Sequence, residues 1–175
     1  SGILTPTVTP VIGNGVVIDL EVLFGELAGL QERGVDTSRL VISPDANIIT
    51  PYHVVLDKVT ERFLGKSKIG TTGRGIGAAY ADKVARQGVR MSDFRAKDRL
   101  VDKVAVLDAY YKPLFKHIFN EHLPSPGEVV DQLWEVQPLL APLLADTATL
   151  VNDALADGKR VLAEGAQGIM LDIDF

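Results

Sequence analysis

The sequence predicts an α/β fold with a mostly parallel sheet, flanking helices and a helical insertion at about residues 95–157. Short runs of β-branched residues alternate with segments of helical periodicity before that insertion. A glycine-rich loop at residues 70–77 separates two of the predicted helices. The length of 175 residues suits a single domain over residues 1–175, because one domain takes about 100–200 residues.

Composition excludes several classes of protein. The hydrophobic content of 46% excludes a disordered chain, and the absence of cysteine excludes disulfides, thiolate nucleophiles and cysteine-based metal sites. A net charge of −5 argues against a nucleic-acid partner. No apolar run reaches the roughly 20 residues of a membrane span, and no signal peptide is recognisable. We therefore expect a cytoplasmic protein with no membrane partner.

The first elements follow from turn and cap residues. β-Branched residues on both sides of Gly13-Asn14-Gly15 predict a strand, a tight turn and a second strand over residues 7–18. Asp19 then predicts the start of a helix that ends at Gly34. Residues 39–43 predict a short apolar strand. The apolar face of the helix comprises Leu20, Leu23, Phe24, Leu27 and Leu30.

Thr50-Pro51 predicts the next helix, which ends at Gly65 and turns Val55, Val59 and Phe63 inward. A further helix is expected at residues 78–86, after the glycine-rich loop.

The insertion is expected to be helical. Residues 95–121 carry its longest apolar stripe, with a kink at Pro113. Ser125 and Glu128 form a capping box, and residues 146–156 predict the last helix. Residues 161–163 predict a buried strand. The stripe comprises Val101, Val104, Leu107, Tyr111, Leu114 and Ile118.

The loop Gly70-Thr-Thr-Gly-Arg-Gly-Ile-Gly77 has the composition of a phosphate cradle. Glycines let the backbone approach a ligand, Thr71, Thr72 and Arg74 supply donors, and the following helix directs its amino-terminal amides at an anion. The loop lacks the lysine of a Walker A motif and the spacing of a dinucleotide fingerprint. From the residues alone, a plain glycine turn is an equal alternative.

Two further polar segments are candidates. Lys83, Arg86 and Arg90 form a positive cluster, although a solvated helix end is the simpler interpretation. Gln167 follows the strand predicted at 161–163, where α/β proteins bind ligands, and its amide could read a purine edge. The alternative for Gln167 is a glycine turn with an exposed amide.

Other polar residues carry weaker signals. His53, His117 and His122 are expected to be structural or surface residues. His117 and His122 are five residues apart, and neither has a carboxylate companion at ligand spacing. Asp172 and Asp174 are weak evidence for a cation.

Four motifs together resemble adenylosuccinate synthetase. They lie at residues 11–17, 69–77 and 82–90, and at 164–168 followed by 171–174, in that family's order and at about its separations. The resemblance spans nearly the whole chain and is weakest over residues 95–145. Ala78 departs from the family, which usually has proline there, and no ligand group is lost by that change.

The resemblance implies GTP-dependent ligation of L-aspartate to inosine monophosphate (IMP), giving adenylosuccinate, GDP and phosphate in AMP biosynthesis. It implies that Thr72 bonds the IMP phosphate and that Gln167 lies near the purine O6. It further implies a homodimer in which Arg86 reaches the partner's IMP, and it places Arg74 near the aspartate.

The family's chain is more than twice as long, so we expect this one to be the central portion of a longer, P-loop-related enzyme. The GTP loop, the Mg²⁺ ligands and the catalytic aspartate and histidine of the family match nothing here. The resemblance thus implies no catalytic or metal-binding residue in this chain, which is expected to be inactive alone. The alternative is a non-catalytic module that binds a nucleotide phosphate or provides a dimer surface.

Overall fold

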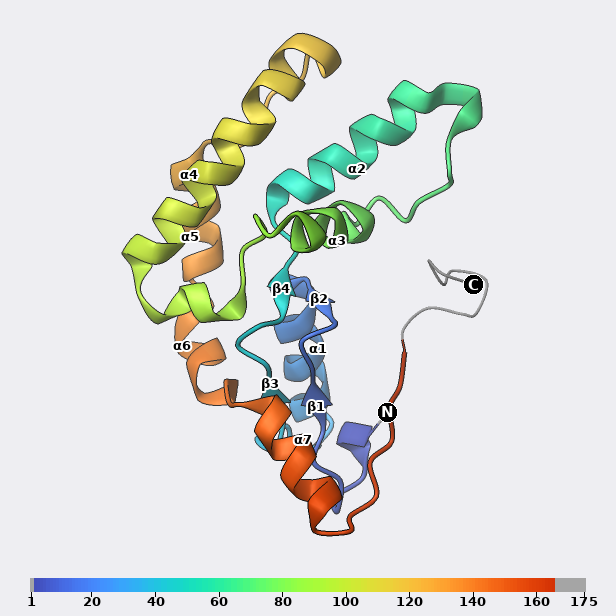
Figure 1. Cartoon of the computed structure of the whole chain (residues 1–175), viewed down its shortest axis with the longest axis vertical. Helices are drawn as coiled ribbons and strands as arrows, with labels where there is room; N and C mark the ends of the chain where they lie inside the picture. The colour runs from blue at the N-terminus through green and yellow to red at the C-terminus, as the bar shows by residue number, and fades with distance from the viewer. Residues whose placement is uncertain (1, 166–175) are drawn as a thin grey trace.

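The structure is a computed structural model and describes residues 2–165. Short parallel strand pairs occupy the middle of the molecule, and helices surround them (Figure 1). This arrangement confirms the predicted α/β class with parallel strands and flanking helices.

The strands pair in parallel across a helical crossover. β1 (Val11–Ile12) pairs with β3 (Val41–Ile42), and β2 (Val17–Ile18) pairs with β4 (Asn47–Ile48). The predicted strand–turn–strand unit is therefore present, but its two strands do not pair with each other. α1 (Leu20–Glu32) provides the crossover that parallel pairing requires.

Local caps set the helix starts as predicted. The Asp19 carboxylate accepts the N–H of Val22 at 3.2 Å and begins α1. α2 (Pro51–Leu64) begins after Thr50 and ends at Gly65. α3 (Ile76–Ala85) begins two residues before the predicted start.

The prediction that Phe63 faces inward from α2 is wrong. Its side chain is 67% exposed, whereas Val59 on the same helix is buried. The Phe63 ring contacts Phe119 edge-to-face. The helix extends past the core at this end, so Phe63 finds one aromatic neighbour but no enclosing layer.

The predicted insertion is helical throughout most of its length. Ser125 and Glu128 form the predicted capping box, with the N–H of Ser125 donating to Glu128 at 2.8 Å. Pro113 lies two residues before a π-helical turn that begins at Phe115. The elements are η3 (Met91–Arg95), α4 (Lys97–Leu114), the π-helical η4 (Phe115–Phe119), α5 (Pro126–Trp134), α6 (Gln137–Leu140), η5 (Ala141–Leu143) and α7 (Thr147–Ala156).

The predicted α4 stripe is right at its centre and wrong at two positions. Val104, Leu107 and Tyr111 are buried, whereas Val101 and Ile118 are exposed. α5 covers only one side of α4, so the outer positions of the stripe face solvent.

Residues 161–163 form no strand, so the prediction of a buried strand there is wrong. Leu162 is 89% exposed, and no described segment pairs with it. An apolar triplet becomes a strand only where a neighbouring strand takes up its backbone N–H and C=O groups. Gln167, Asp172 and Asp174 lie outside the described residues.

One hydrophobic core joins the strands to the helical part, with Ile42 and Ile48 from the strands and Leu100 and Leu107 from α4 all fully buried. α3 lies below α2 and above β2 and β4 (Figure 1). Two short 3-10 helices, η1 (Gly2–Leu4) and η2 (Gly65–Ser67), complete the described elements. None of the helices in residues 2–165 is long and apolar enough to cross a membrane.

Candidate functional site

The glycine-rich loop is held from outside by two carboxylates of α2. Glu61 accepts the N–H groups of Ile69 at 3.0 Å and Gly70 at 2.9 Å, and Asp57 accepts the N–H of Gly75 at 2.9 Å. Gly70, Gly73 and Gly75 all have positive φ. Part of the loop's donor capacity is therefore used by the protein itself.

Gly75 is the tightest point of this loop. A Cβ there would lie 2.6 Å from the carbonyl carbon of His53, on the backbone of α2. Only glycine combines that approach with a φ of 78°. The glycines are thus more than a flexible turn, because they dock the start of α3 against α2.

The remaining donors of the loop face outward. Within residues 2–165, the N–H groups of residues 71–74 have no hydrogen-bond acceptor, and the same holds for the hydroxyls of Thr71 and Thr72. Both threonines are exposed. Together they form a set of donors of the kind that binds an anionic oxygen.

A cavity of about 520 Å³ opens beside these donors. Three cationic side chains line it, from Lys58 and Arg62 on α2 and from Lys68 just after η2, and one anionic side chain, from Glu61 on α2. Arg62 is paired with Glu121 at 2.5 Å, while Lys58 and Lys68 form no ion pair among the described residues. The other residues that line the cavity are Gly65, Thr71, Thr72 and Gly73.

Sequence reasoning missed the α2 cations. Lys58 and Arg62 are four residues apart and so share a helix face. That spacing, directly upstream of a glycine-rich loop, was the available signal.

The predicted site residues lie at opposite ends of α3. Thr72 and Arg74 precede its first residue, and Arg86 caps its last residue. Ten helical residues separate them, which is about 15 Å along the helix axis. The structure brings Thr72 and Arg74 near one another but does not bring Arg86 to them within one chain.

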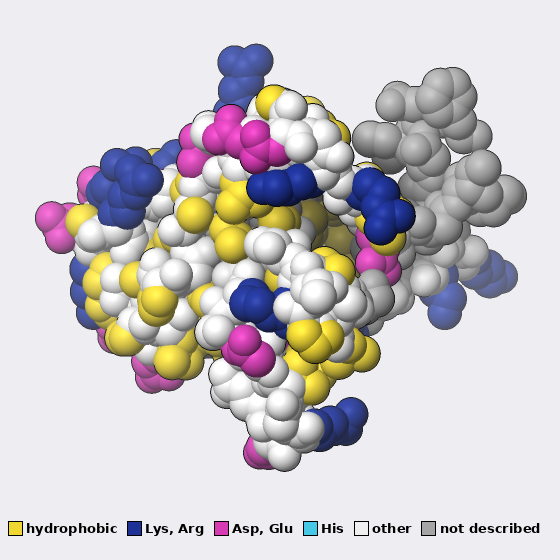
Figure 2. All heavy atoms as spheres, turned by 90° about the horizontal axis from the view of Figure 1, so that it is seen from below, with side chains coloured by type: hydrophobic (Ala, Val, Ile, Leu, Met, Phe, Trp, Pro, Cys, Tyr) yellow, Lys and Arg dark blue, Asp and Glu magenta, His cyan; other side chains and the backbone are white. Residues whose placement is uncertain are grey.

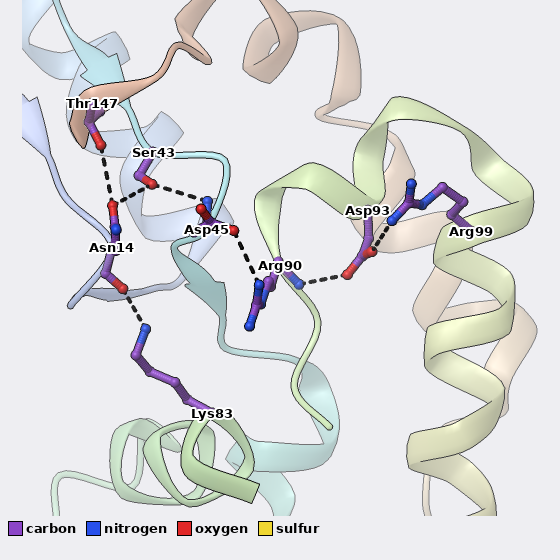
Figure 3. Close-up of polar contacts among 8 residues, drawn as sticks. All are labelled: Asn14, Ser43, Asp45, Lys83, Arg90, Asp93, Arg99 and Thr147. Carbon is purple, nitrogen blue, oxygen red and sulfur yellow. Dashed lines mark hydrogen bonds and ion pairs between the residues drawn. The ribbon is translucent and has the colours of Figure 1, made fainter. Parts of the chain in front are cut away.

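Two of the three cations in the Lys83, Arg86 and Arg90 cluster have structural partners (Figure 3). Lys83 donates to the backbone carbonyl of Asn14, and Arg90 pairs with Asp45 at 3.2 Å. Arg86 is exposed and has no side-chain partner among the described residues. The structure therefore separates one available arginine from two engaged cations.

The Lys83 contact belongs to a network that fixes the turn between β1 and β2. Tyr80 on α3 donates its hydroxyl to the carbonyl of Gly15 at 3.0 Å. The Asn14 Oδ1 accepts from Ser43 at 2.9 Å and from Thr147 at 3.3 Å (Figure 3). α3 is thus anchored to the strands as well as to α2.

Asp82 is the most buried charged group beside the site, at 3% exposure. Burial alone would raise the pKa of its carboxyl group, but hydrogen bonds from His53, Gln87 and Tyr111 hold that pKa below its ordinary value of 3.8. Burial and the Asp82 charge raise the pKa of the Tyr111 hydroxyl. The expectation that His53 is structural is consistent with its complete burial.

The sequence model of the adenylosuccinate synthetase family matches residues 1–175. The chain belongs to that family. It is 58% identical over 175 residues to adenylosuccinate synthetase of Streptomyces coelicolor and 53% identical over 174 residues to that of Bifidobacterium adolescentis. Each alignment covers 99% of this chain and 41% of the relative. The chain thus spans about two fifths of the length of these synthetases.

The fold is that of a solved synthetase. A structure described as the fully ligated adenylosuccinate synthetase from Plasmodium falciparum matches with a TM-score of 0.85 and 28% sequence identity. The match covers 99% of this chain and 40% of that one. The resemblance to adenylosuccinate synthetase that four short motifs indicated is therefore confirmed for both family and fold.

The described residues do not fit a magnesium site. Within residues 2–165, no three His, Asp or Glu side chains come together as the ligands of a metal ion would.

The face seen from below carries Lys and Arg side chains scattered among apolar and uncharged ones (Figure 2). On that side, the described surface lacks the continuous positive stripe that marks nucleic-acid-binding proteins.

Proposed function

We propose that this segment forms part of the IMP site of a GTP-dependent ligase that joins L-aspartate to IMP, with Mg²⁺, GTP and the catalytic groups supplied by other parts of the enzyme. In this proposal Thr72 bonds the IMP phosphate, Gln167 lies near the purine O6 and Arg74 faces the aspartate. Arg86 serves the IMP site of the other subunit of a homodimer.

The observation that carries the proposal is the isolation of Arg86. Its neighbours Lys83 and Arg90 are engaged by the protein, whereas the Arg86 guanidinium is exposed and has no partner in the described part of the chain. It also lies the length of α3 from Thr72. An arginine in this position is suited to a phosphate outside its own subunit, where its planar fork can bind two oxygens.

The loop at Thr72 supports the other half of the proposal. Its N–H groups and hydroxyls, which have no acceptor in the part of the chain that the structure describes, border a cavity with Lys58 and Lys68. Neither lysine forms an ion pair with another described residue, so both supply positive charge. A phosphate bound there would be held by neutral donors at close range and by two exposed ammonium groups. Electrostatic positioning of this kind orients a nucleotide before its purine reacts.

Subunit mixing tests the proposal in the full-length enzyme. Thr72→Val and Arg86→Ala should each abolish most activity when assayed alone. In a hybrid dimer, one site combines an intact Thr72 with an intact Arg86 from the other subunit. Random exchange of the two variants should therefore restore about one quarter of the wild-type activity.

The outcome without recovery is equally informative. If Arg86 acts in its own subunit, each hybrid site keeps one defect and mixing restores nothing. Arg86→Lys provides the matched charge control, and it should still weaken IMP binding because an ammonium group cannot form the planar fork. Unchanged IMP affinity in that variant would remove Arg86 from the site.

A phosphate-binding module without ligase activity is the second candidate, favoured by the cavity beside Thr72 alone. It predicts that inorganic phosphate protects the enzyme against thermal unfolding, with no turnover of IMP and aspartate in the presence of GTP. Turnover by the full-length protein would exclude it.

A further inference from the structure

The carboxylate of Asp82 accepts hydrogen bonds from two helices and from the turn that follows α3. His53 on α2 donates to Oδ2 at 2.9 Å, and Tyr111 on α4 donates to the same oxygen at 2.8 Å. Gln87, just past α3, donates to Oδ1 at 2.7 Å. We call His53, Asp82, Gln87 and Tyr111 the Asp82 cluster.

On the buried side of the Asp82 cluster, the hydrogen bonds of His53 determine which of its ring nitrogens carries the proton. The backbone N–H of Thr50 donates to Nδ1 of His53 at 2.9 Å, so Nε2 carries the ring proton and donates it to Asp82. The Tyr111 ring packs edge-on against His53 and Phe115. Since both donors are fixed, the Asp82 carboxylate cannot rotate.

The outer side of the cluster controls the residues that follow α3. The main-chain carbonyl of Asp82 accepts the N–H groups of Gln87 at 3.0 Å and Gly88 at 3.2 Å. Its side chain holds the Gln87 amide as well. Asp82 therefore restrains the turn after α3 through both its backbone and its carboxylate.

Arg86 lies inside that restrained turn and has a φ of 64°. A residue other than glycine adopts this left-handed conformation only when its surroundings impose it. On the far side, a Cβ at Gly88 would lie 2.4 Å from the Asn47 side-chain nitrogen, and the N–H of Ile48 donates to Val89 at 2.9 Å. Arg86 is thus held between the Asp82 cluster and β4.

We propose that Asp82 is a positioning residue that, through Gln87, fixes the direction in which Arg86 leaves the end of α3. This inference rests on the proposed role of Arg86 at the partner's IMP. A fixed backbone reduces the conformational freedom that the arginine loses on binding, so it strengthens binding without touching the ligand.

The test removes the hydrogen bond from Gln87 while keeping the side chain's length. In the full-length enzyme, Gln87→Met should raise the KM for IMP about five- to tenfold, which is less than the full effect of losing one hydrogen bond to a charged group because the backbone around Arg86 keeps its other hydrogen bonds. The KM values for aspartate and GTP should stay within about twofold. Gln31→Met is the matched control, because Gln31 on α1 donates a hydrogen bond of the same length, 2.7 Å, to Thr37.

The control separates positioning from general destabilisation. Both variants should lower the melting temperature, Gln87→Met by more because its hydrogen bond goes to a carboxylate, but Gln31→Met should leave the KM for IMP unchanged. If Gln87→Met lowers the melting temperature and leaves that KM unchanged as well, the cluster is structural only and the proposal fails.

A double variant distinguishes this proposal from the one it rests on. When Arg86 is already alanine, Gln87→Met should add no further increase in the KM for IMP. An additional increase equal to that of the single variant would overturn the positioning role. If Arg86→Ala itself leaves the KM for IMP unchanged, the assignment of Arg86 fails first, and the positioning role fails with it.

Discussion

The two ends of α3 are built in opposite ways. Before its first turn, the loop exposes Thr71, Thr72 and Arg74 and keeps several N–H groups that find no acceptor within residues 2–165. After its last turn, the chain is fixed by the buried Asp82 cluster and by pairing with β4. One end offers donors to a ligand, while the other presents a single arginine from a rigid base.

In the proposed function, a ten-residue helix serves two sites. An open loop could adjust its donors around a bound phosphate, and such segments are drawn from the less stable parts of a fold. An arginine that reaches another subunit, as proposed for Arg86, would gain more from a fixed backbone. The difference between the two ends is therefore one of restraint.

The largest effect is expected at Gly75, where the open loop is anchored. Gly75→Ala would place a Cβ 2.6 Å from the His53 backbone at a φ of 78°. The free energy of unfolding should fall by about 3 kcal/mol or more, because neither backbone can relieve the clash cheaply. Urea unfolding of the full-length enzyme would measure it.

Gly77→Ala is the matched control, since a Cβ there meets nothing within 4 Å and the residue lies inside α3. It should be neutral or stabilising by up to about 1 kcal/mol, as expected for alanine in a helix. Equal stability of the two alanine variants would show that α3 is not docked through Gly75.

An intermediate effect is expected at Asp82, on the rigid end. Because its folded pKa lies below the ordinary value of 3.8, ionised Asp82 contributes stability that is present above pH 3.8. That contribution is lost as the pH falls through the folded pKa. Asp82→Asn should therefore be less stable than wild type at neutral pH and should lose less stability on acidification.

The measurement is urea unfolding at several pH values between about 7 and 3, where the acid slope of the variant should be shallower by at most about one proton. Asp153→Asn, an exposed residue with no ion pair in the described part of the chain, provides the control and should keep the wild-type slope. Parallel slopes for Asp82→Asn and wild type would contradict the charged state of the cluster.

The smallest effect is expected at Glu61, the one acidic residue lining the cavity. Glu61→Gln keeps one amide oxygen as an acceptor, so one of the N–H groups of Ile69 and Gly70 loses its acceptor, and it removes a negative charge beside the proposed phosphate site. The KM for IMP should fall by about twofold at low salt and approach the wild-type value at high salt, because a partly exposed charge is screened.

Glu32→Gln, at the end of α1, removes the same charge far from the cavity and should leave that KM unchanged. An identical response of the two variants would indicate that the cavity does not hold the phosphate.

The sequence predicted the helices better than the strand partners. Asp19 and Ser125 cap helices through residues three positions away, so their signals lie within one short window. β1 and β2 were predicted as two strands around a tight turn. β-Branched residues around a glycine turn give the same pattern whether the two strands pair with each other or with other strands. Only the α1 crossover decided that their partners were β3 and β4.

The candidate site divides in the same way. The glycine spacing pointed to the loop at Thr72, but it did not reveal that Asp57 and Glu61 accept the N–H groups of Gly70 and Gly75 in the loop and of Ile69 just before it. Those carboxylates come from the preceding helix, and their orientation depends on how α2 packs against α3.

The sequence by itself determined the family, the helix boundaries and the presence of three cations near the end of α3, because each depends on neighbouring residues or on motif order. Only the tertiary structure decided that Lys83 and Arg90 are engaged while Arg86 is available. Lys83 finds its partner 69 residues away at Asn14, and Arg90 finds its partner 45 residues away at Asp45. A side chain's freedom depends on which distant groups the fold brings within hydrogen-bond reach, and no local pattern encodes that.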